Sequence, residues 1–267
     1  MRAVPFVKAT ACGNDFLLVE AKDVDRDRVE FTREICHRHL GVGADGVEWL
    51  SPGTDADLEI HLINADGSPA EISGNGTRCV AAHWFSGIKA DQKMDRVLIR
   101  TDAGLKISNL IRRVDPEFEF ETEMGPATVE SPLSLRLKDG PVQGIPVSTG
   151  NPHYVIFVDN FPPSWQQQGA EISAHAHFPQ GVNVELVKVI SEKTIEIRIY
   201  ERGAGATQSS GTGSCASAVA AIATGRARSP LEVLAPGGAQ TVRWENGEIY
   251  LRGPARLICR GEFLWAA

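Results

Sequence analysis

Two short glycine-rich stretches of this chain resemble each other in composition and in the segment that comes after each of them. The first is Ser73-Gly74-Asn75-Gly76 and the second is Ser210-Gly211-Thr212-Gly213; each leads into a run of small and apolar residues with helical character. Glycines let the backbone turn tightly, and the adjoining helix adds the positive end of its dipole. Each stretch is therefore predicted to bind an anion, a carboxylate rather than a phosphate.

The spacing of these stretches indicates an internal duplication. Three pairs of residues or motifs share a separation of 137 positions: Ser73 with Ser210, Gly13-Asn14 with Gly150-Asn151, and Asn64 with Glu201. A period of this length is typical of a duplicated domain rather than of a solenoid repeat. We therefore expect two pseudo-symmetric lobes, each presenting a helix N-terminus to a shared cleft, which is where small-molecule sites tend to form.

Length and charge restrict the function further. A chain of 267 residues is long enough for two domains with cores of their own. The net charge of −7 and the lack of a dense basic stretch argue against nucleic acid as a partner. No apolar run approaches the length of a membrane span, and the N-terminus has no secretory apolar region. The five cysteines form no CxxC pair, so the sequence suggests neither a zinc site nor a disulfide framework. We expect a cytoplasmic protein.

Hydrophobic periodicity and turn residues predict a mixed α and β chain. Strands are expected at residues 4–8, 16–20, 47–50, 58–64, 97–101, 104–110, 118–124, 154–159, 194–201, 231–234, 240–244 and 255–264. Helices are expected at 26–40, from the first glycine-rich stretch to about 85, around 172–176, and from the second stretch to 225. The first lobe should comprise 1–118 and a returning C-terminal strand of about 255–267, and the second lobe 119–254.

Other expectations concern loops and histidines. Gly41 is expected to close the first helix, and the glycine-rich segment after it should be a loop facing the cleft. The three glutamines at 166–168 are expected in a solvated loop. The histidines at positions 37, 39, 175 and 177 are interpreted as structural or solvent-facing rather than catalytic.

Several polar residues beside the turns are candidates for ligand contact. An asparagine next to glycine often only stabilises a turn, but the repeat pairs Asn14 with Asn151 and places Asn64 ahead of the first turn. Arg202 would suit a carboxylate through its forked guanidinium, the alternative being a surface ion pair with Glu201.

At these residues the chain resembles the diaminopimelate epimerase family. The resemblance extends over most of the chain and rests on residues 11–16, 64–68, 72–79, 150–153, 181–183 and 201–215. It implies an α+β fold of two mirror-related lobes, each a mainly antiparallel sheet wrapped around a central helix. It also implies an isomerase of lysine and cell-wall biosynthesis that interconverts LL- and meso-diaminopimelate without a cofactor. A homodimer is left open.

The resemblance also assigns roles to individual residues. Asn64, Asn183 and Arg202 would hold the distal end of the amino acid. Its reacting end would be held by Asn14, Gly74, Asn75, Asn151, Gly211 and Thr212, with Glu201 and His153 assisting at the catalytic positions Ser73 and Ser210.

The chain departs from the family at its two proton-transfer positions. The resemblance implies a cysteine at the start of each glycine-rich turn, where this chain has Ser73 and Ser210. A thiol ionises near neutral pH at a helix N-terminus, whereas an alcohol stays protonated. Cys79 and Cys215 lie further along their helices and should not replace the missing thiols. Ala206 is a second departure, at a position where the resemblance implies glutamate.

These departures leave three hypotheses. The first is a diaminopimelate epimerase-like enzyme whose turnover the serines depress. The second is an amino-acid-binding pseudoenzyme, and the third is a proline racemase-type isomerase or dehydratase. Loss of both thiols is expected to lower epimerisation by at least about 10²–10⁴-fold while ground-state binding survives.

Overall fold

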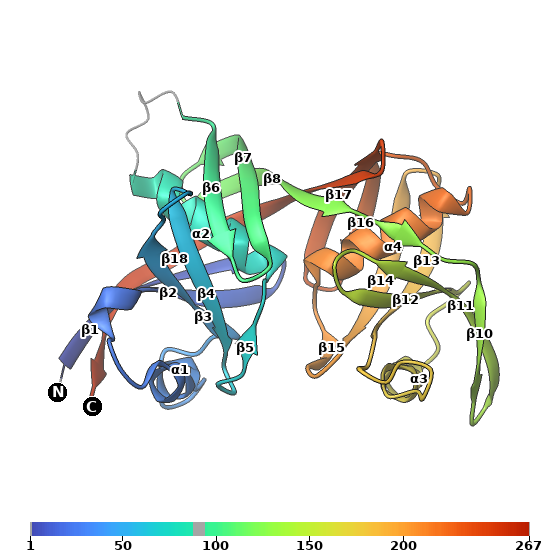
Figure 1. Cartoon of the computed structure of the whole chain (residues 1–267), viewed down its shortest axis with the longest axis horizontal. Coiled ribbons are helices and arrows are strands. Elements are labelled where there is room, and N and C mark those ends of the chain that lie inside the picture. Colours follow the sequence, from blue (N-terminus) through green and yellow to red (C-terminus); the bar gives the residue numbers. More distant parts are fainter. Residues whose placement is uncertain (1, 88–93, 267) are drawn as a thin grey trace. The chain divides into compact units, whose positions relative to one another are not determined.

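The computed structural model describes residues 2–87 and 94–266, which divide into two compact units. Unit 1 comprises Met1–Thr122 and Gly253–Ala267, and unit 2 comprises Glu123–Arg252. The fold is α+β, with many strands and few helices, and in each unit strands surround one central helix (Figure 1).

The first segment of unit 1 begins with a hairpin and ends with the strand that leads into unit 2; most of the last strand, β18 (Glu248–Trp265), also belongs to unit 1. Its elements are β1 (Arg2–Ala11), β2 (Asn14–Glu20), the 3-10 helix η1 (Ala21–Asp23), α1 (Arg28–Cys36), β3 (Gly46–Pro52), β4 (Leu58–Asn64), β5 (Pro69–Ala70), α2 (Gly74–Gly87), β6 (Arg96–Thr101), β7 (Gly104–Val114) and β8 (Glu117–Pro126).

Unit 2 has its elements in a similar order and ends with the strand that returns to unit 1. Its elements are β9 (Thr128–Val129), β10 (Leu133–Leu137), β11 (Gly140–Ser148), β12 (Pro152–Phe157), α3 (Trp165–Ser173), β13 (Asn183–Ser191), β14 (Thr194–Glu201), β15 (Gly205–Thr207), α4 (Gly211–Ala223), β16 (Leu231–Ala235), β17 (Gly238–Glu245) and β18 (Glu248–Trp265).

Strand pairing repeats between the units as the sequence repeat does. In unit 1, β2 pairs with β3 and β4 with β6 in parallel, while β3–β4 and β6–β7 are antiparallel. In unit 2, β12 pairs with β13 and β14 with β16 in parallel, while β13–β14 and β16–β17 are antiparallel. The duplicated sequence therefore folds into a duplicated topology.

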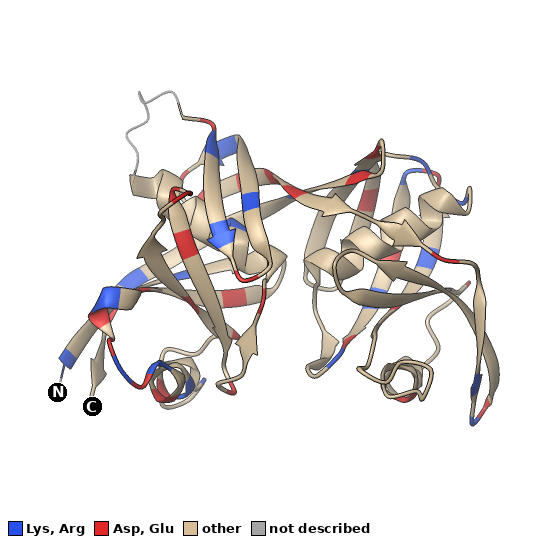
Figure 2. Cartoon of the chain, viewed as in Figure 1, with Lys and Arg blue, Asp and Glu red and all other residues tan. Residues whose placement is uncertain are grey.

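The central helices are buried on nearly all sides. From Gly74 to Ala82 every residue of α2 is buried, and α4 is buried from Gly213 to Ala221. In α4 these residues are small, and the helix has no charged residue (Figure 2). Short side chains allow strands to pack closely against such a helix, and a helix that is apolar all round must be buried. The α4 residues form one core cluster with strands of unit 2, and α2 does the same in unit 1.

The structure corrects the expected extent of both short helices. Helix α1 ends at Cys36 rather than at 40, because His37 has an extended backbone and its Nδ1 accepts hydrogen bonds from the amides of His39 and Leu40. Helix α3 spans Trp165–Ser173, so it contains the three glutamines expected in a loop and ends before most of the predicted segment 172–176. Gln166 and Gln167 are solvent-exposed on this helix.

Three strands of unit 2 that have five or more residues, β10, β11 and β13, are absent from the prediction. The expected C-terminal strand begins earlier, because β18 pairs with β17 from Glu248 and continues to pair with β1 as far as Trp265. The division between units falls at Thr122/Glu123 and Arg252/Gly253, where the sequence suggested 118/119 and 254/255.

None of the helices in the described parts of the chain, 2–87 and 94–266, has both the length and the apolar character needed to cross a bilayer.

Candidate functional site

Each unit places a serine immediately before its central helix. Ser73 Oγ accepts a hydrogen bond from the Gly76 amide at 3.0 Å, and Ser210 Oγ accepts one from the Gly213 amide at 3.2 Å. The serine side chain thereby satisfies one of the amides that a helix start leaves without an intrahelical partner. We call residues 73–76 the first serine turn and residues 210–213 the second serine turn.

Two asparagines meet at the first serine turn. Asn75 Nδ2 donates to Asn14 Oδ1 at 2.6 Å, and the Asn75 Oδ1 atom accepts from the Arg78 guanidinium. Arg78 is fully buried and also donates to the Pro254 carbonyl of β18. A single asparagine, Asn75, is thus fixed from both ends of its amide group, which orients it.

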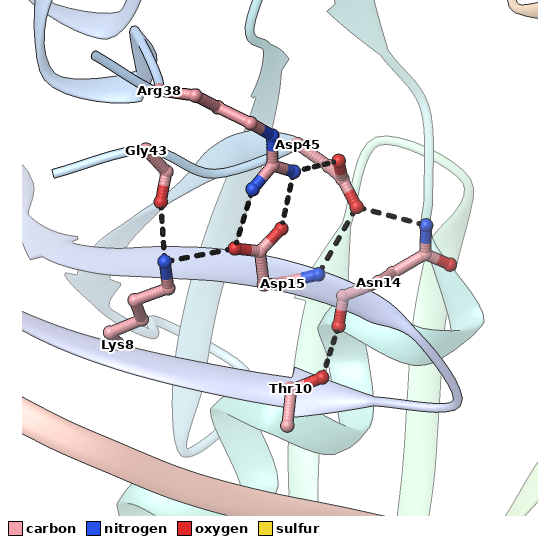
Figure 3. Close-up of polar contacts among 7 residues, drawn as sticks. All are labelled: Lys8, Thr10, Asn14, Asp15, Arg38, Gly43 and Asp45. Carbon is pink, nitrogen blue, oxygen red and sulfur yellow. Dashed lines mark hydrogen bonds and ion pairs between the residues drawn. The ribbon is translucent and has the colours of Figure 1, made fainter. Parts of the chain in front are cut away.

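A charged network between the β1–β2 hairpin and the segment that joins α1 to β3 holds Asn14 from its other side (Figure 3). Asp45 accepts from Asn14 Nδ2 at 3.1 Å, and Arg38 binds both Asp45 and Asp15. Lys8 adds an ion pair with Asp15 at 2.9 Å. Burial alone would raise the pKa of Asp15, but hydrogen bonds from Arg38 and Lys8 outweigh it and lower the pKa. The Asn14 amide is therefore oriented by fixed charges.

In unit 2 the corresponding asparagine joins a histidine to the second serine turn. Asn151 Nδ2 donates to Thr212 Oγ1 at 3.4 Å, and Thr212 Oγ1 lies 3.4 Å from Ser210 Oγ. His153 Nε2 lies 2.9 Å from Asn151 Oδ1. Because that oxygen only accepts, Nε2 carries a proton and donates it.

The other nitrogen of His153 contacts a buried glutamate. His153 Nδ1 lies 2.8 Å from Glu185 Oε1, and both side chains are fully buried. Burial raises the pKa of Glu185, and the neighbouring histidine works against this shift. A contiguous polar chain thus runs from Glu185 through His153 and Asn151 to the second serine turn.

Glu201 reaches the same turn from the end of β14. Burial raises the pKa of its carboxyl, and the neighbouring Ser210 hydroxyl acts in the opposite direction. A carboxyl with a raised pKa is a stronger base than an ordinary one, which makes Glu201 a suitable proton-transfer partner for the adjacent alcohol.

The residues assigned to the distal end of a ligand are less closely connected to the turns. In unit 2, Asn183 Oδ1 accepts from the Arg202 amide at 2.9 Å, which ties the start of β13 to the end of β14. The Arg202 side chain is exposed and donates to the Gln180 carbonyl; no ion pair with Glu201 occurs in the described structure. In unit 1, Asn64 donates to Ser68 Oγ at 3.1 Å within its own turn.

Sequence reasoning missed a pair of glutamates that lie beneath the serine turns. A Cβ atom built on Gly76 would overlap Glu48 Oε1, and one built on Gly213 would lie 2.8 Å from Glu185 Oε1. Glu48 and Glu185 are both completely buried and are separated by the same 137 positions as the serines. The signal that could have found them was a glutamate at matching positions of two strands, each with apolar residues on both sides of it.

The thiols of the two central helices cannot serve the turns. Cys79 and Cys215 are fully buried, and burial raises the pKa of the Cys79 thiol far above its ordinary range. A buried, protonated thiol is a poor nucleophile and a poor base. Among the described residues, no group of three or more His, Cys, Asp or Glu side chains is arranged to hold a metal ion.

The chain matches a known protein family along most of its length. The diaminopimelate epimerase family model matches residues 6–130 and 145–258. Diaminopimelate epimerase of Pelotomaculum thermopropionicum is 36% identical over 276 residues, covering 97% of this chain and 98% of the relative. The Synechococcus elongatus diaminopimelate epimerase is also 36% identical, covering 99% of this chain and all of the relative.

Solved structures share the fold at low sequence identity. A Bacillus anthracis phenazine biosynthesis protein of the PhzF family superposes with a TM-score of 0.75 at 16% identity, covering 99% of this chain and 100% of that chain. An Agrobacterium vitis hydroxyproline epimerase with bound trans-4-hydroxy-L-proline gives 0.74 at 16% identity, covering 98% and 91%.

Proposed function

The chain belongs to the diaminopimelate epimerase family, and on this basis we propose that it binds diaminopimelate and epimerises it at one α-carbon without a cofactor. The observation that supports this most directly is the pair of serine turns, each a hydroxyl at a helix N-terminus with an oriented asparagine beside it. Backbone amides and the helix dipole at such a turn favour a bound carboxylate.

In this proposal Ser73 and Ser210 are the two groups that transfer the α-proton. One hydroxyl oxygen takes the α-proton while its own proton passes to a neighbouring carboxylate. The other hydroxyl gives its proton to the α-carbon and regains one from a neighbouring carboxylic acid, with Glu201 and His153 assisting in unit 2. Asn14, Asn75, Asn151 and Thr212 hold the reacting end with the backbone of Gly74 and Gly211. We assign Asn64, Asn183 and Arg202 to the distal end, where the guanidinium of Arg202 suits a carboxylate.

Serine at both positions implies slow turnover with intact binding. An alcohol needs a partner to act as a base, whereas a thiolate forms readily near neutral pH. Replacing Ser73 and Ser210 together by cysteine is therefore expected to raise epimerisation by at least about 10²–10⁴-fold. The affinity for diaminopimelate should change little, because the groups that hold it are untouched.

The test combines calorimetry with isotope exchange. We expect diaminopimelate to release heat on binding and proline to release none, and we expect deuterium from D₂O to appear at the α-carbon of diaminopimelate. The double Ser→Cys variant should exchange faster. If that variant binds diaminopimelate and shows no faster exchange, the two-serine assignment is wrong; binding of proline alone would point to a proline racemase-type activity.

A second candidate function is sequestration of the amino acid without turnover. The observation that favours it is the same pair of alcohols in place of groups that ionise near neutral pH. Binding of diaminopimelate with no deuterium incorporation over many hours would support it, and steady exchange at neutral pH would exclude it.

A further inference from the structure

Glu48 is a carboxyl buried within unit 1. Neither of its carboxylate oxygens has a hydrogen-bond partner among the described residues, and its side chain is completely buried. Its in-register neighbours on β2 and β4 are Leu18 and Leu62. A buried polar group without a partner costs free energy, so its presence in an otherwise apolar strand calls for a function.

The position of Glu48 relates it to Ser73. A Cβ atom built on Gly76 would overlap Glu48 Oε1 and would lie 3.2 Å from Ser73 Cβ. Only a glycine at position 76 leaves room for the carboxyl at the start of α2. The carboxyl is therefore placed against the same turn that carries the serine.

The repeat shows why Glu48 differs from its counterpart. In unit 2, Glu185 is paired with His153, and Glu201 serves Ser210. In unit 1 the positions that correspond to His153 and Glu201 are Phe16 and Asn64. Of the three positions in unit 1 that match His153, Glu185 and Glu201, Glu48 alone has an ionisable side chain.

We propose that Glu48 is the proton-holding partner of Ser73, acting on substrate through that hydroxyl. This inference rests on the function proposed above. As the Cα–H bond of the substrate breaks, its electron pair stays on carbon and its proton goes to Ser73 Oγ. The original hydroxyl proton of Ser73 leaves that oxygen for a Glu48 carboxylate oxygen, directly or through one water. The reverse transfer returns the proton.

The ionisation of Glu48 suits this role. Burial, and secondarily the negative charge of Asp102, raise its pKa from the ordinary 4.5 to about 8. Asp102 lies in the turn between β6 and β7 and pairs with His61. Cys79 of α2 also interacts electrostatically with Glu48. A proton acceptor with a pKa near the working pH transfers protons in both directions efficiently.

The test measures α-deuterium exchange of diaminopimelate in D₂O as a function of pH. For the unchanged protein we expect the rate to rise with pH through about 8, as Glu48 loses its proton. Glu48→Gln preserves shape but cannot accept a proton, so the rate should fall by about 10²-fold or more and this rise should vanish, with little change in KM. Glu48→Asp should retain the pH dependence.

Two further variants separate this role from a structural one. Asp102→Asn removes the charge that helps to raise the Glu48 pKa, so the rise in rate should move to lower pH. In a Ser73→Ala background, Glu48→Gln should cause no additional loss, because groups that act as a unit are not additive.

Each outcome decides between the two proposals. If the unchanged protein gives no exchange, both the proposed function and the role of Glu48 fall. If it does exchange, but Glu48→Gln keeps the rate within about threefold and keeps the pH profile, only the role of Glu48 falls. Additive losses with Ser73→Ala, or an Asp102→Asn profile that does not move, would overturn it as well.

Discussion

Unit 1 has Phe16 where unit 2 has His153, and Asn64 where unit 2 has Glu201. The two serine turns are otherwise built alike, each with a serine that caps a buried helix and a glycine that lies against a buried glutamate. The glutamate of unit 2 is partnered by a histidine, whereas Glu48 of unit 1 has no hydrogen-bond partner among the described residues.

This difference shows how a duplicated backbone acquires two different proton-transfer environments. Main-chain geometry, capping and helix dipole are common to both turns, so they can treat a bound carboxylate alike. The groups that set proton affinity differ, because a paired buried carboxyl and an unpaired one have different pKa values. Four changes to the chain would test how far the difference extends.

Removing the histidine of unit 2 should have the largest effect on stability. His153→Phe copies the residue of unit 1 and leaves Glu185 buried without its partner. Breaking a buried pair in this way should lower the free energy of unfolding by about 3–5 kcal/mol, measured by urea denaturation. In the control, His153→Phe combined with Glu185→Leu should recover much of the loss. A single variant as stable as the unchanged protein would show that the pair contributes nothing.

Replacing a turn glycine by alanine should have the next largest effect on stability, and the effect should differ between the two turns. Gly76→Ala would force its methyl group into Glu48, which is buried and cannot swing into solvent. Such overpacking should cost about 1–3 kcal/mol in urea denaturation. Gly213→Ala meets Glu185 Oε1 at 2.8 Å and should cost less. Adding Glu48→Ala to Gly76→Ala should relieve the clash; equal costs for the two glycines would contradict the difference in spacing.

The unpaired glutamate should make stability depend on pH. The folded protein holds the Glu48 proton up to about pH 8, whereas the unfolded chain releases it near 4.5. The contribution of Glu48 to the free energy of unfolding therefore falls as pH rises from about 4.5 to about 8. Relative to the unchanged protein, Glu48→Gln should gain stability progressively over this range, because the amide has no proton to release. A constant difference between pH 5 and pH 8.5 in urea melts would argue that Glu48 does not titrate there.

Removing either capping hydroxyl should lower stability least, and by similar amounts in the two units. Ser73→Ala and Ser210→Ala each remove one hydrogen bond to a helix-start amide, at a cost of about 1 kcal/mol. The loss at Ser210 should be slightly larger, because Glu201 also loses a hydrogen-bonding partner there. Differential scanning calorimetry of the two variants provides the comparison, and a Ser73→Ala loss clearly greater than that at Ser210 would count against it.

The duplication, the family and the residues at the turns could all be predicted from the sequence alone. The 137-residue spacing and the Ser-Gly-x-Gly turns are local patterns, and local patterns specify turns and helix starts directly. Strands with clear alternation, such as residues 118–124, were predicted for the same reason, and β8 contains that segment. Helix α3 was misplaced because its three glutamines and its glycine resemble a loop, although Ile172 anchors it in the core.

Whether a buried polar group has a partner, and how its pKa is shifted, depends in contrast on the tertiary structure. Glu48 and Glu185 occupy matching positions in the sequence, yet whether each has a partner depends on a residue from another strand, Phe16 or His153. Arg78 similarly depends on the Pro254 carbonyl, far away in sequence. Desolvation and long-range contacts set a pKa, and neither is encoded in the residue type or in its near neighbours.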